Sequence, residues 1–186
     1  MVRTPSTMLP LGTEAEDFSL INIDGRTLSF ADVAGEHGTV LMFICNHCPF
    51  VKHVADELAA IGHEYMPKGI GMVAINSNDV AAHPADSPEQ MVHESEQRGY
   101  PFPYLFDETQ MIAKKFGAGY TPECFVLNQK REVVYMGAFD DSPDKTKVKV
   151  KYLEDAVTAA LAGGLPKITE TVPIGCRIRI ARTRRK

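Results

Sequence analysis

Residues 39–49 read TVLMFICNHCP. The first six of them form an unbroken apolar run, which is typical of a strand buried on both faces of a sheet. The run ends directly at Cys45, and after Pro49 apolar residues recur at helical spacing. These apolar residues are Val51, Val54, Leu58, Ile61 and Tyr65. The stretch therefore predicts a buried strand that turns into an amphipathic helix, with two cysteines at the junction.

Strands and helices alternate on both sides of this junction. Upstream, the apolar runs 18–23 and 27–30 flank Asp24-Gly25, which is a strong signal for a two-residue hairpin turn. Downstream, the patterns predict strands at 71–76, 102–106, 124–127 and 133–136, and helices at 88–99, 107–116 and 145–162. This order predicts an α/β protein: a three-layer α/β/α sandwich around a mixed sheet, with an N-terminal β-hairpin and an inserted segment at about 77–103.

The size and composition fit one domain over residues 1–186, with a core at about 17–163 and a C-terminal extension at 164–186. A hydrophobic content of 44% excludes a disordered chain, and no apolar run approaches the length of about 20 residues that a membrane-spanning helix needs. The first ten residues lack the apolar core of a signal peptide, which predicts a cytoplasmic protein. In that compartment a cysteine pair is more often catalytic or metal-binding than a structural disulfide.

The charge is distributed unevenly along the chain. Residues 177–186 contain six Lys and Arg and no acid, so the rest of the chain holds 14 basic against 24 acidic residues. Alternating Ile and Arg at 177–180 are typical of a short edge strand. Docking of this basic end on the acidic body explains the pattern better than nucleic-acid binding, because no aromatic residues are interleaved with the charges. We expect no nucleic-acid or membrane partner, and a monomer or homodimer.

The CxxC motif, Cys45-Asn46-His47-Cys48, is the main candidate for chemistry. A thiol where a strand turns into a helix faces unpaired N–H groups and the positive end of the helix dipole, and both favour the thiolate. Cys48 lies one helical turn further on and can form a disulfide with Cys45. His47, when protonated, adds positive charge near Cys45. The motif predicts that Cys45 attacks a substrate disulfide and that Cys48 then resolves the mixed disulfide.

Alternatives to this redox role remain open. Two buried structural cysteines are one of them. A non-catalytic metal-binding or carrier module is another, but the pair supplies two zinc ligands where a tetrahedral site needs four, and no second CxxC or HxxxH exists. We therefore predict no metal and no cofactor, only an external electron donor.

The strand–CxxC–helix unit, together with Thr121-Pro122 and the strand–hairpin–helix finish, resembles the thioredoxin superfamily. The resemblance implies that Thr121 and Pro122 lie opposite the two sulfurs, with a cis peptide bond, and that their backbone binds an extended substrate. It implies a thiol–disulfide oxidoreductase that acts on disulfides of proteins or small thiols. A histidine before the second cysteine is a feature that this motif shares with disulfide isomerases. Their reduction potential is about −180 mV, against about −270 mV for thioredoxin. We therefore predict a potential above that of thioredoxin.

The hairpin, the insertion and the stretch CNHCPFVKH resemble the peroxiredoxin-like, AhpC/TSA-related branch of that superfamily. The branch implies an alternative function, that of an antioxidant thiol peroxidase. Peroxiredoxins carry a hydroxyl three residues before the reactive cysteine, where this chain has Met42. Thioredoxins bury an acid six residues before the first cysteine, where this chain has Thr39. A proton acceptor for the pair must therefore come from elsewhere.

Two further cysteines lie outside the motif. Cys124 is at the start of an apolar strand, which favours an inert core residue over a redox partner. Cys176 follows an extended segment beyond the last helix that can fold back over the body. It is a candidate additional redox thiol, and a packing role is the open alternative.

Overall fold

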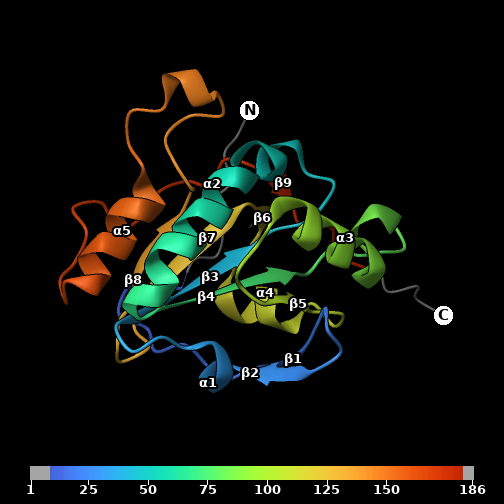
Figure 1. The fold of residues 1–186 in the computed structure, drawn as a ribbon, viewed down its shortest axis with the longest axis horizontal. Helices are drawn as coiled ribbons and strands as arrows, with labels where there is room; N and C mark the ends of the chain where they lie inside the picture. Colours follow the sequence, from blue (N-terminus) through green and yellow to red (C-terminus); the bar gives the residue numbers. More distant parts are fainter. Residues whose placement is uncertain (1–8, 182–186) are drawn as a thin grey trace.

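A seven-stranded mixed sheet lies at the centre of the computed structural model, which describes residues 9–181 (Figure 1). The strands are β1 (Ser19–Asn22), β2 (Thr27–Ser29), β3 (Gly38–Phe43), β4 (Ile70–Asn76), β5 (Tyr104–Phe106), β6 (Tyr120–Thr121), β7 (Glu123–Leu127), β8 (Val133–Gly137) and β9 (Cys176–Arg177). The order in the sheet is β2-β1-β5-β4-β3-β7-β8, and β6 pairs with β9 separately. β3, β4 and β5 are parallel, and the outer strands are antiparallel to their neighbours.

Helices cover both faces of this sheet. They are α1 (Phe30–Val33), α2 (Pro49–Tyr65), α3 (Pro88–Arg98), α4 (Met111–Phe116) and α5 (Tyr152–Leu161), with short 3-10 turns η1 (Met66–Lys68), η2 (Pro84–Asp86) and η3 (Lys145–Lys147). Val40 and Met42 of β3 pack with α2 and α5, whereas Leu41 and Phe43 pack on the opposite face with α1 and α4 (Figure 1). The three-layer α/β/α sandwich is thus confirmed, and so is the burial of the strand predicted at 39–44 on both of its faces.

The N-terminal hairpin is also confirmed. β1 and β2 pair antiparallel, with Ser19 opposite Ser29, and Gly25 in the turn has a φ of +84°. This left-handed conformation suits glycine because it has no Cβ. β1 also pairs with β5, so the hairpin extends one edge of the main sheet.

The helix predicted over 145–162 is interrupted. η3 is followed by a non-helical stretch, and α5 begins only at Tyr152. The Asp141 carboxylate accepts hydrogen bonds from the N–H groups of Lys149, at 2.9 Å, and Val150, at 3.1 Å. Because these N–H groups are bound to a side chain, they are not available to a continuous helix.

The helix predicted from Asp107 also starts later, at Met111. Gln110 is its N-cap residue, with a φ of 61°, which is uncommon for a side chain other than Gly, Asn or Asp. The Asp107 carboxylate still caps the helix, since it accepts the N–H groups of Ile112 and Ala113 at 3.1 and 3.0 Å. Asp107 therefore caps this helix as predicted, but the helix begins at Met111 and its N-cap position is taken by Gln110.

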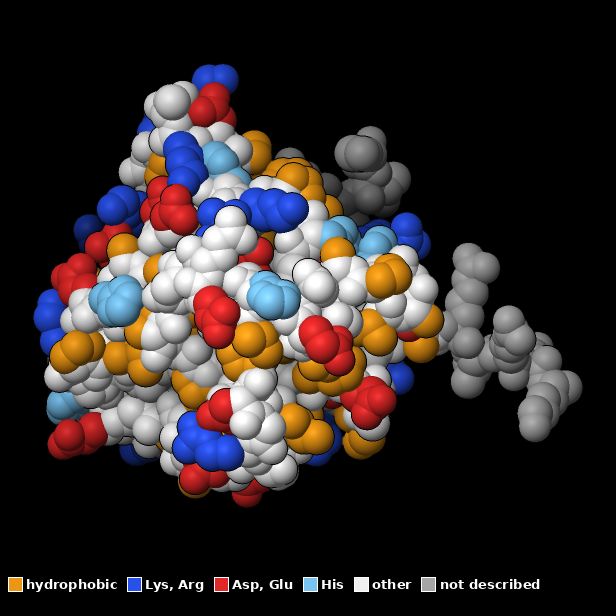
Figure 2. Space-filling view, turned by 45° about the vertical axis from the view of Figure 1, so that its right-hand side comes forward, with side chains coloured by type: hydrophobic (Ala, Val, Ile, Leu, Met, Phe, Trp, Pro, Cys, Tyr) orange, Lys and Arg blue, Asp and Glu red, His pale blue; other side chains and the backbone are white. Residues whose placement is uncertain are grey.

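Charged side chains of both signs are interspersed over the face drawn in Figure 2. No helix among residues 9–181 is long and apolar enough to span a membrane. Of the basic C-terminal end, the structure describes Arg177 and Arg179, and the basic residues from 182 onward lie outside the described residues.

Candidate active site

The two cysteines of the CxxC motif lie where β3 passes into α2. Both side chains are buried, with 1% of Cys45 and none of Cys48 exposed. Cys48 is the N-cap residue of α2, and Pro49 occupies the first helical position. The helix N-terminus therefore acts most directly on Cys48, and its N–H groups contribute to the lowered pKa of that thiol. The sequence predicted that it would act on Cys45, but the backbone N–H groups of residues 46 and 47 point to another acceptor.

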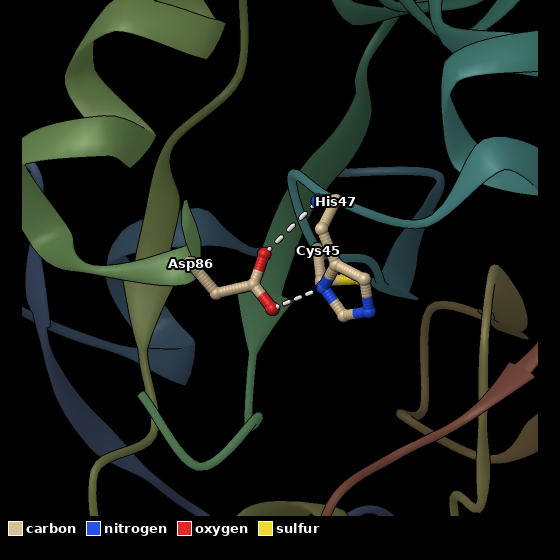
Figure 3. A group of neighbouring side chains, drawn as sticks. All are labelled: Cys45, His47 and Asp86. Carbon is tan, nitrogen blue, oxygen red and sulfur yellow. Dashed lines mark hydrogen bonds and ion pairs between the residues drawn. The ribbon is translucent and has the colours of Figure 1, made fainter. Parts of the chain in front are cut away.

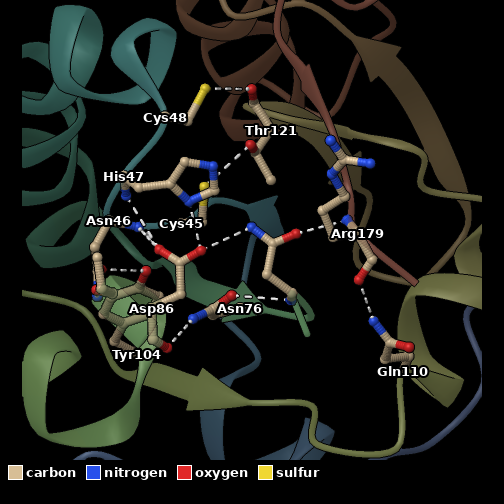
Figure 4. A network of polar contacts seen from close by, with 12 residues as sticks. Cys45, Asn46, His47, Cys48, Asn76, Asp86, Tyr104, Gln110, Thr121 and Arg179 are labelled. Carbon is tan, nitrogen blue, oxygen red and sulfur yellow. Dashed lines mark hydrogen bonds and ion pairs between the residues drawn. The ribbon is translucent and has the colours of Figure 1, made fainter. Parts of the chain in front are cut away.

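The loop before β7 closes the site on the opposite side. The Thr121–Pro122 peptide bond is cis. The Cys48 thiol donates to the Thr121 carbonyl at 3.2 Å, and the Thr121 hydroxyl lies 3.3 Å from the Cys45 sulfur (Figure 4). Thr121 therefore contacts both sulfurs, as the resemblance implied.

The inserted segment supplies a buried acid that the sequence did not single out. Asp86, at the end of η2, is 0% exposed. Its Oδ1 accepts the backbone N–H groups of Asn46 and His47 at 2.8 and 3.0 Å. Its Oδ2 lies 2.6 Å from His47 Nδ1 and accepts from Asn78 Nδ2 at 3.0 Å. Figure 3 shows the carboxylate facing the imidazole, with the Cys45 sulfur beside the ring.

A signal for this acid was present in the topology. Polar residues begin at Asn76, where β4 ends, and continue through the insertion. β3 and β4 are parallel neighbours, so their carboxyl ends lie at the same edge of the sheet, where α/β proteins bind ligands. The residues after β4 therefore lie on the same edge of the sheet as Cys45, although the sequence pattern does not tell which of them points inward.

Further polar contacts fix His47 and the loop that carries it. The imidazoles of His47 and His83 are stacked, with centroids 4.0 Å apart and planes 8° from parallel. Asn46 accepts from the buried Tyr104 hydroxyl at 2.9 Å and donates to the Ala85 carbonyl at 2.9 Å. The insertion thus holds the CxxC loop from one side, in a network that is shown in Figure 4.

The two thiols share their protons unequally. Hydrogen bonding from Cys45, assisted by Cys176 and the Val51 N–H, lowers the pKa of Cys48 to about 4. The same hydrogen bond, together with burial and the negative charge of Asp86, raises the pKa of Cys45. The reduced pair therefore shares one proton between two sulfurs, and the thiolate is favoured on Cys48. The hydrogen bond from Cys48 to the Thr121 carbonyl forms when the proton is on Cys48.

Cys45, His47 and Asp86 offer ligand atoms that lie within 4.8 Å of one another, so they can be compared with a metal site. The His47 nitrogen and the Asp86 oxygen are only 2.6 Å apart, which is a hydrogen-bond distance. The other Asp86 oxygen is bonded to two backbone N–H groups. A metal would have to break the His47–Asp86 contact, so the observed geometry is that of a hydrogen-bonded group.

The remaining two cysteines differ in their surroundings. Cys124 lies within β7 and is 0% exposed, and burial raises the pKa of its thiol. Cys176 is half-buried in β9, directly opposite Thr121 in the β6–β9 pair. The structure thus brings Cys176 to the site and leaves Cys124 in the core.

Comparisons with known proteins agree with this geometry. A model of the AhpC/TSA family matches residues 11–136. The chain is 26% identical over 134 residues to the thiol-disulfide oxidoreductase ResA of Geobacillus thermodenitrificans, covering 70% of each chain. The chain belongs to the AhpC/TSA family.

Solved structures are similar over nearly the whole length. A crystal structure of an uncharacterized conserved protein from Geobacillus kaustophilus is 44% identical, covers 98% of each chain and has a TM-score of 0.90. A hypothetical protein from Sinorhizobium meliloti is 37% identical, with coverage of 97% and 100% and a TM-score of 0.90. Peroxidoxin BcpB from Mycobacterium tuberculosis is 19% identical, with coverage of 82% and 96% and a TM-score of 0.63, which shows a shared fold.

Proposed function

We propose that this AhpC/TSA-family protein performs its thiol–disulfide oxidoreductase reaction with the Cys45–Cys48 pair, on disulfides of proteins or small thiols. One observation supports this most directly: both sulfurs lie within hydrogen-bond reach of Thr121, next to the cis proline. Three groups that dithiol exchange requires, a thiolate, a neighbouring thiol and a backbone edge for the substrate, are therefore within one site.

The coupling between the two sulfurs gives the first step its proton acceptor. The two sulfurs share one proton as a coupled pair, and it lies on Cys48 when Cys45 attacks a substrate disulfide as the thiolate. One substrate sulfur forms a bond to Cys45, and the other leaves as a thiolate. Cys48 thereby takes the role that an acid at position 39 would have had.

The second step closes the active-site disulfide. Cys48 attacks the Cys45 sulfur, the bond from Cys45 to the substrate breaks, and the proton of Cys48 goes to the departing substrate thiolate. The substrate is reduced by two electrons and the pair is oxidised. An external thiol donor must then reduce the Cys45–Cys48 disulfide, and the sequence of steps also runs in reverse.

His47 and Asp86 act on the Cys45 side of the pair. Asp86 fixes the two backbone N–H groups that follow Cys45 and orients the imidazole through Nδ1. We assign His47 a role in tuning the reactivity of Cys45, and Asp86 a role in positioning His47. Thr121 and Pro122 present the substrate.

The direct test is insulin-disulfide reduction with dithiothreitol as the donor. Wild type is expected to accelerate the reaction, and Cys45→Ser and Cys48→Ser are each expected to lose the acceleration. Cys124→Ala is the matched control, because its thiol is fully buried within β7. No acceleration by wild type, or full activity of Cys45→Ser, contradicts the proposal.

One observation favours peroxide as a second substrate. Met42 supplies no hydroxyl, but the structure places the Thr121 hydroxyl 3.3 Å from the Cys45 sulfur. Hydrogen peroxide consumption that depends on Cys45 and falls in Thr121→Val would establish an antioxidant role, and turnover equal to that of free dithiothreitol excludes it. The cytoplasmic location and the monomer or homodimer remain predictions, which fractionation and light scattering can check.

A further inference from the structure

The chain beyond α5 returns across the molecule to the active site. After α5, the backbone pairs with the end of β8, where Met136 N–H donates to the Thr169 carbonyl and Thr171 N–H donates to the Met136 carbonyl. The Thr171 hydroxyl also accepts the Ala138 N–H at 2.8 Å. The segment is therefore fixed to the sheet before it reaches the cysteines.

At the site, residues 175–178 bind along the edge of the loop that precedes the cis proline. β9 pairs antiparallel with β6, so that Cys176 faces Thr121, and the Ile178 N–H donates to the Gly119 carbonyl at 2.9 Å. Gly175 lies so close that a Cβ at this position would be 2.1 Å from the Thr121 carbonyl oxygen. Residues 175–178 thus occupy the backbone edge at which an extended substrate is expected to bind, and an external substrate pairs with Thr121 only when they leave it.

The far end of the segment is fixed by a second set of bonds. Asn78 Oδ1 accepts the Arg179 N–H at 2.8 Å, and the buried Gln110 side chain bonds both the Arg179 carbonyl, at 2.7 Å, and the Ala181 N–H, at 2.8 Å. The backbone of Gln110 is in the left-handed region, where strain is tolerated only if surrounding contacts hold it. Figure 4 shows the hydrogen bond between Gln110 and Arg179 in the same view as the two cysteines.

This docking brings a third thiol to the pair. Cys176 packs against the core cluster that contains Cys45 and Cys48, and it helps to lower the pKa of Cys48. Cys48 in turn lies 3.2 Å from the carbonyl of Thr121, the β-partner of Cys176. Cys45 and Cys176 therefore both have access to the sulfur of Cys48.

We propose that Cys176 is a third redox-active thiol, and that residues 175–181 act as a built-in substrate strand that presents it to Cys48. The proposal rests on the proposed function of the pair. In the oxidised enzyme Cys176 attacks the Cys48 sulfur, the Cys45–Cys48 bond breaks and a Cys48–Cys176 disulfide forms. Cys45 leaves with the electron pair and takes up the proton that Cys176 released, so that no further oxidant is consumed.

The test uses the full-length Cys45→Ser variant and glutathione disulfide as the oxidant. Cys48 attacks glutathione disulfide and releases one glutathione, and Cys176 then displaces the second. The expected product is a monomeric chain with a Cys48–Cys176 disulfide, two hydrogens lighter by mass spectrometry and free of glutathione. Cys45→Ser/Cys124→Ala is the matched control and is expected to give the same product.

Two results would overturn the proposal: a stable glutathione adduct on Cys48 with Cys176 still free, or disulfides between chains only. A second variant tests the docking, since Cys45→Ser/Gly175→Val places a Cβ against Thr121 and is expected to accumulate the glutathione adduct at least tenfold over Cys45→Ser. The outcome is independent of insulin reduction by wild type. Failure of the pair as an oxidoreductase and failure of Cys176 as its partner are thus distinguishable.

Discussion

The replacement of Asp86 by Asn tests how the insertion supports the active site. The amide has the shape of the carboxylate but lacks its charge and one of its acceptor atoms. Its oxygen can still accept the N–H groups of Asn46 and His47. In the unsubstituted protein, His47 Nδ1 and the NH₂ group of Asn78 lie 2.6 and 3.0 Å from Asp86 Oδ2, which is an acceptor. In the variant, both groups face the NH₂ group of the amide instead.

The expected loss of stability follows from these contacts. Two of the four hydrogen bonds to the carboxylate lose their acceptor, and bonds to charged groups contribute about 1.5–3 kcal/mol each. Removing a fully buried charge offsets part of this loss, because its desolvation cost also disappears. We therefore expect Asp86→Asn to lower the free energy of unfolding by about 3 kcal/mol, toward the lower end of that sum.

The measurement is urea denaturation of the reduced protein. Asp79→Asn is the matched control, because this residue of the same insertion is partly exposed and its carboxylate accepts the N–H of nearby Ala81. We expect the control to change stability by less than about 0.5 kcal/mol. A loss below about 1 kcal/mol in Asp86→Asn, or one equal to that of the control, refutes the assigned role of Asp86.

The same substitution has a chemical readout. The negative charge of Asp86 raises the pKa of Cys45, so its removal is expected to lower that pKa. In a Cys48→Ser background, where Cys45 is the thiol of the pair that remains, Asp86→Asn should therefore increase the rate of iodoacetamide alkylation at neutral pH. A slower or unchanged rate contradicts the electrostatic argument.

Four further predictions concern the pair and the core. The thiolate absorbance of the reduced protein at about 240 nm should persist down to about pH 4 and disappear in Cys48→Ser. Because the pKa of folded Cys48 lies below its unfolded value, reduced wild type should gain stability over Cys48→Ser as the pH rises from about 4 toward 9, which denaturation at several pH values checks. The Cys45–Cys48 couple should have a potential above about −270 mV by glutathione equilibration, and a value at or below that of thioredoxin contradicts the influence of the histidine in the motif. Phe125→Ala, which removes a fully buried ring in contact with Phe43 and Phe116, should cost about 3–5 kcal/mol by urea denaturation.

The elements that the sequence predicted correctly are those whose signals are local. The run 39–44 is apolar on both faces because both faces of β3 are covered, and the spacing of apolar residues after Pro49 follows from the single buried side of α2. The element predictions that failed depended on distant or capping contacts. Asp141 removes two N–H groups from the predicted helix over 145–162, and this competition depends on how a loop folds back.

The sequence by itself determined the sandwich, the CxxC pair at the end of the first buried strand and the Thr121–Pro122 loop, because periodicity and short motifs encode them. Only the tertiary structure decided that Asp86 lies behind the pair and that Cys176 lies against it. Both residues reach the site through strand pairing and backbone hydrogen bonds between segments far apart in the chain. Such contacts leave little trace in residue pattern, since backbone N–H and C=O groups are the same at almost every position.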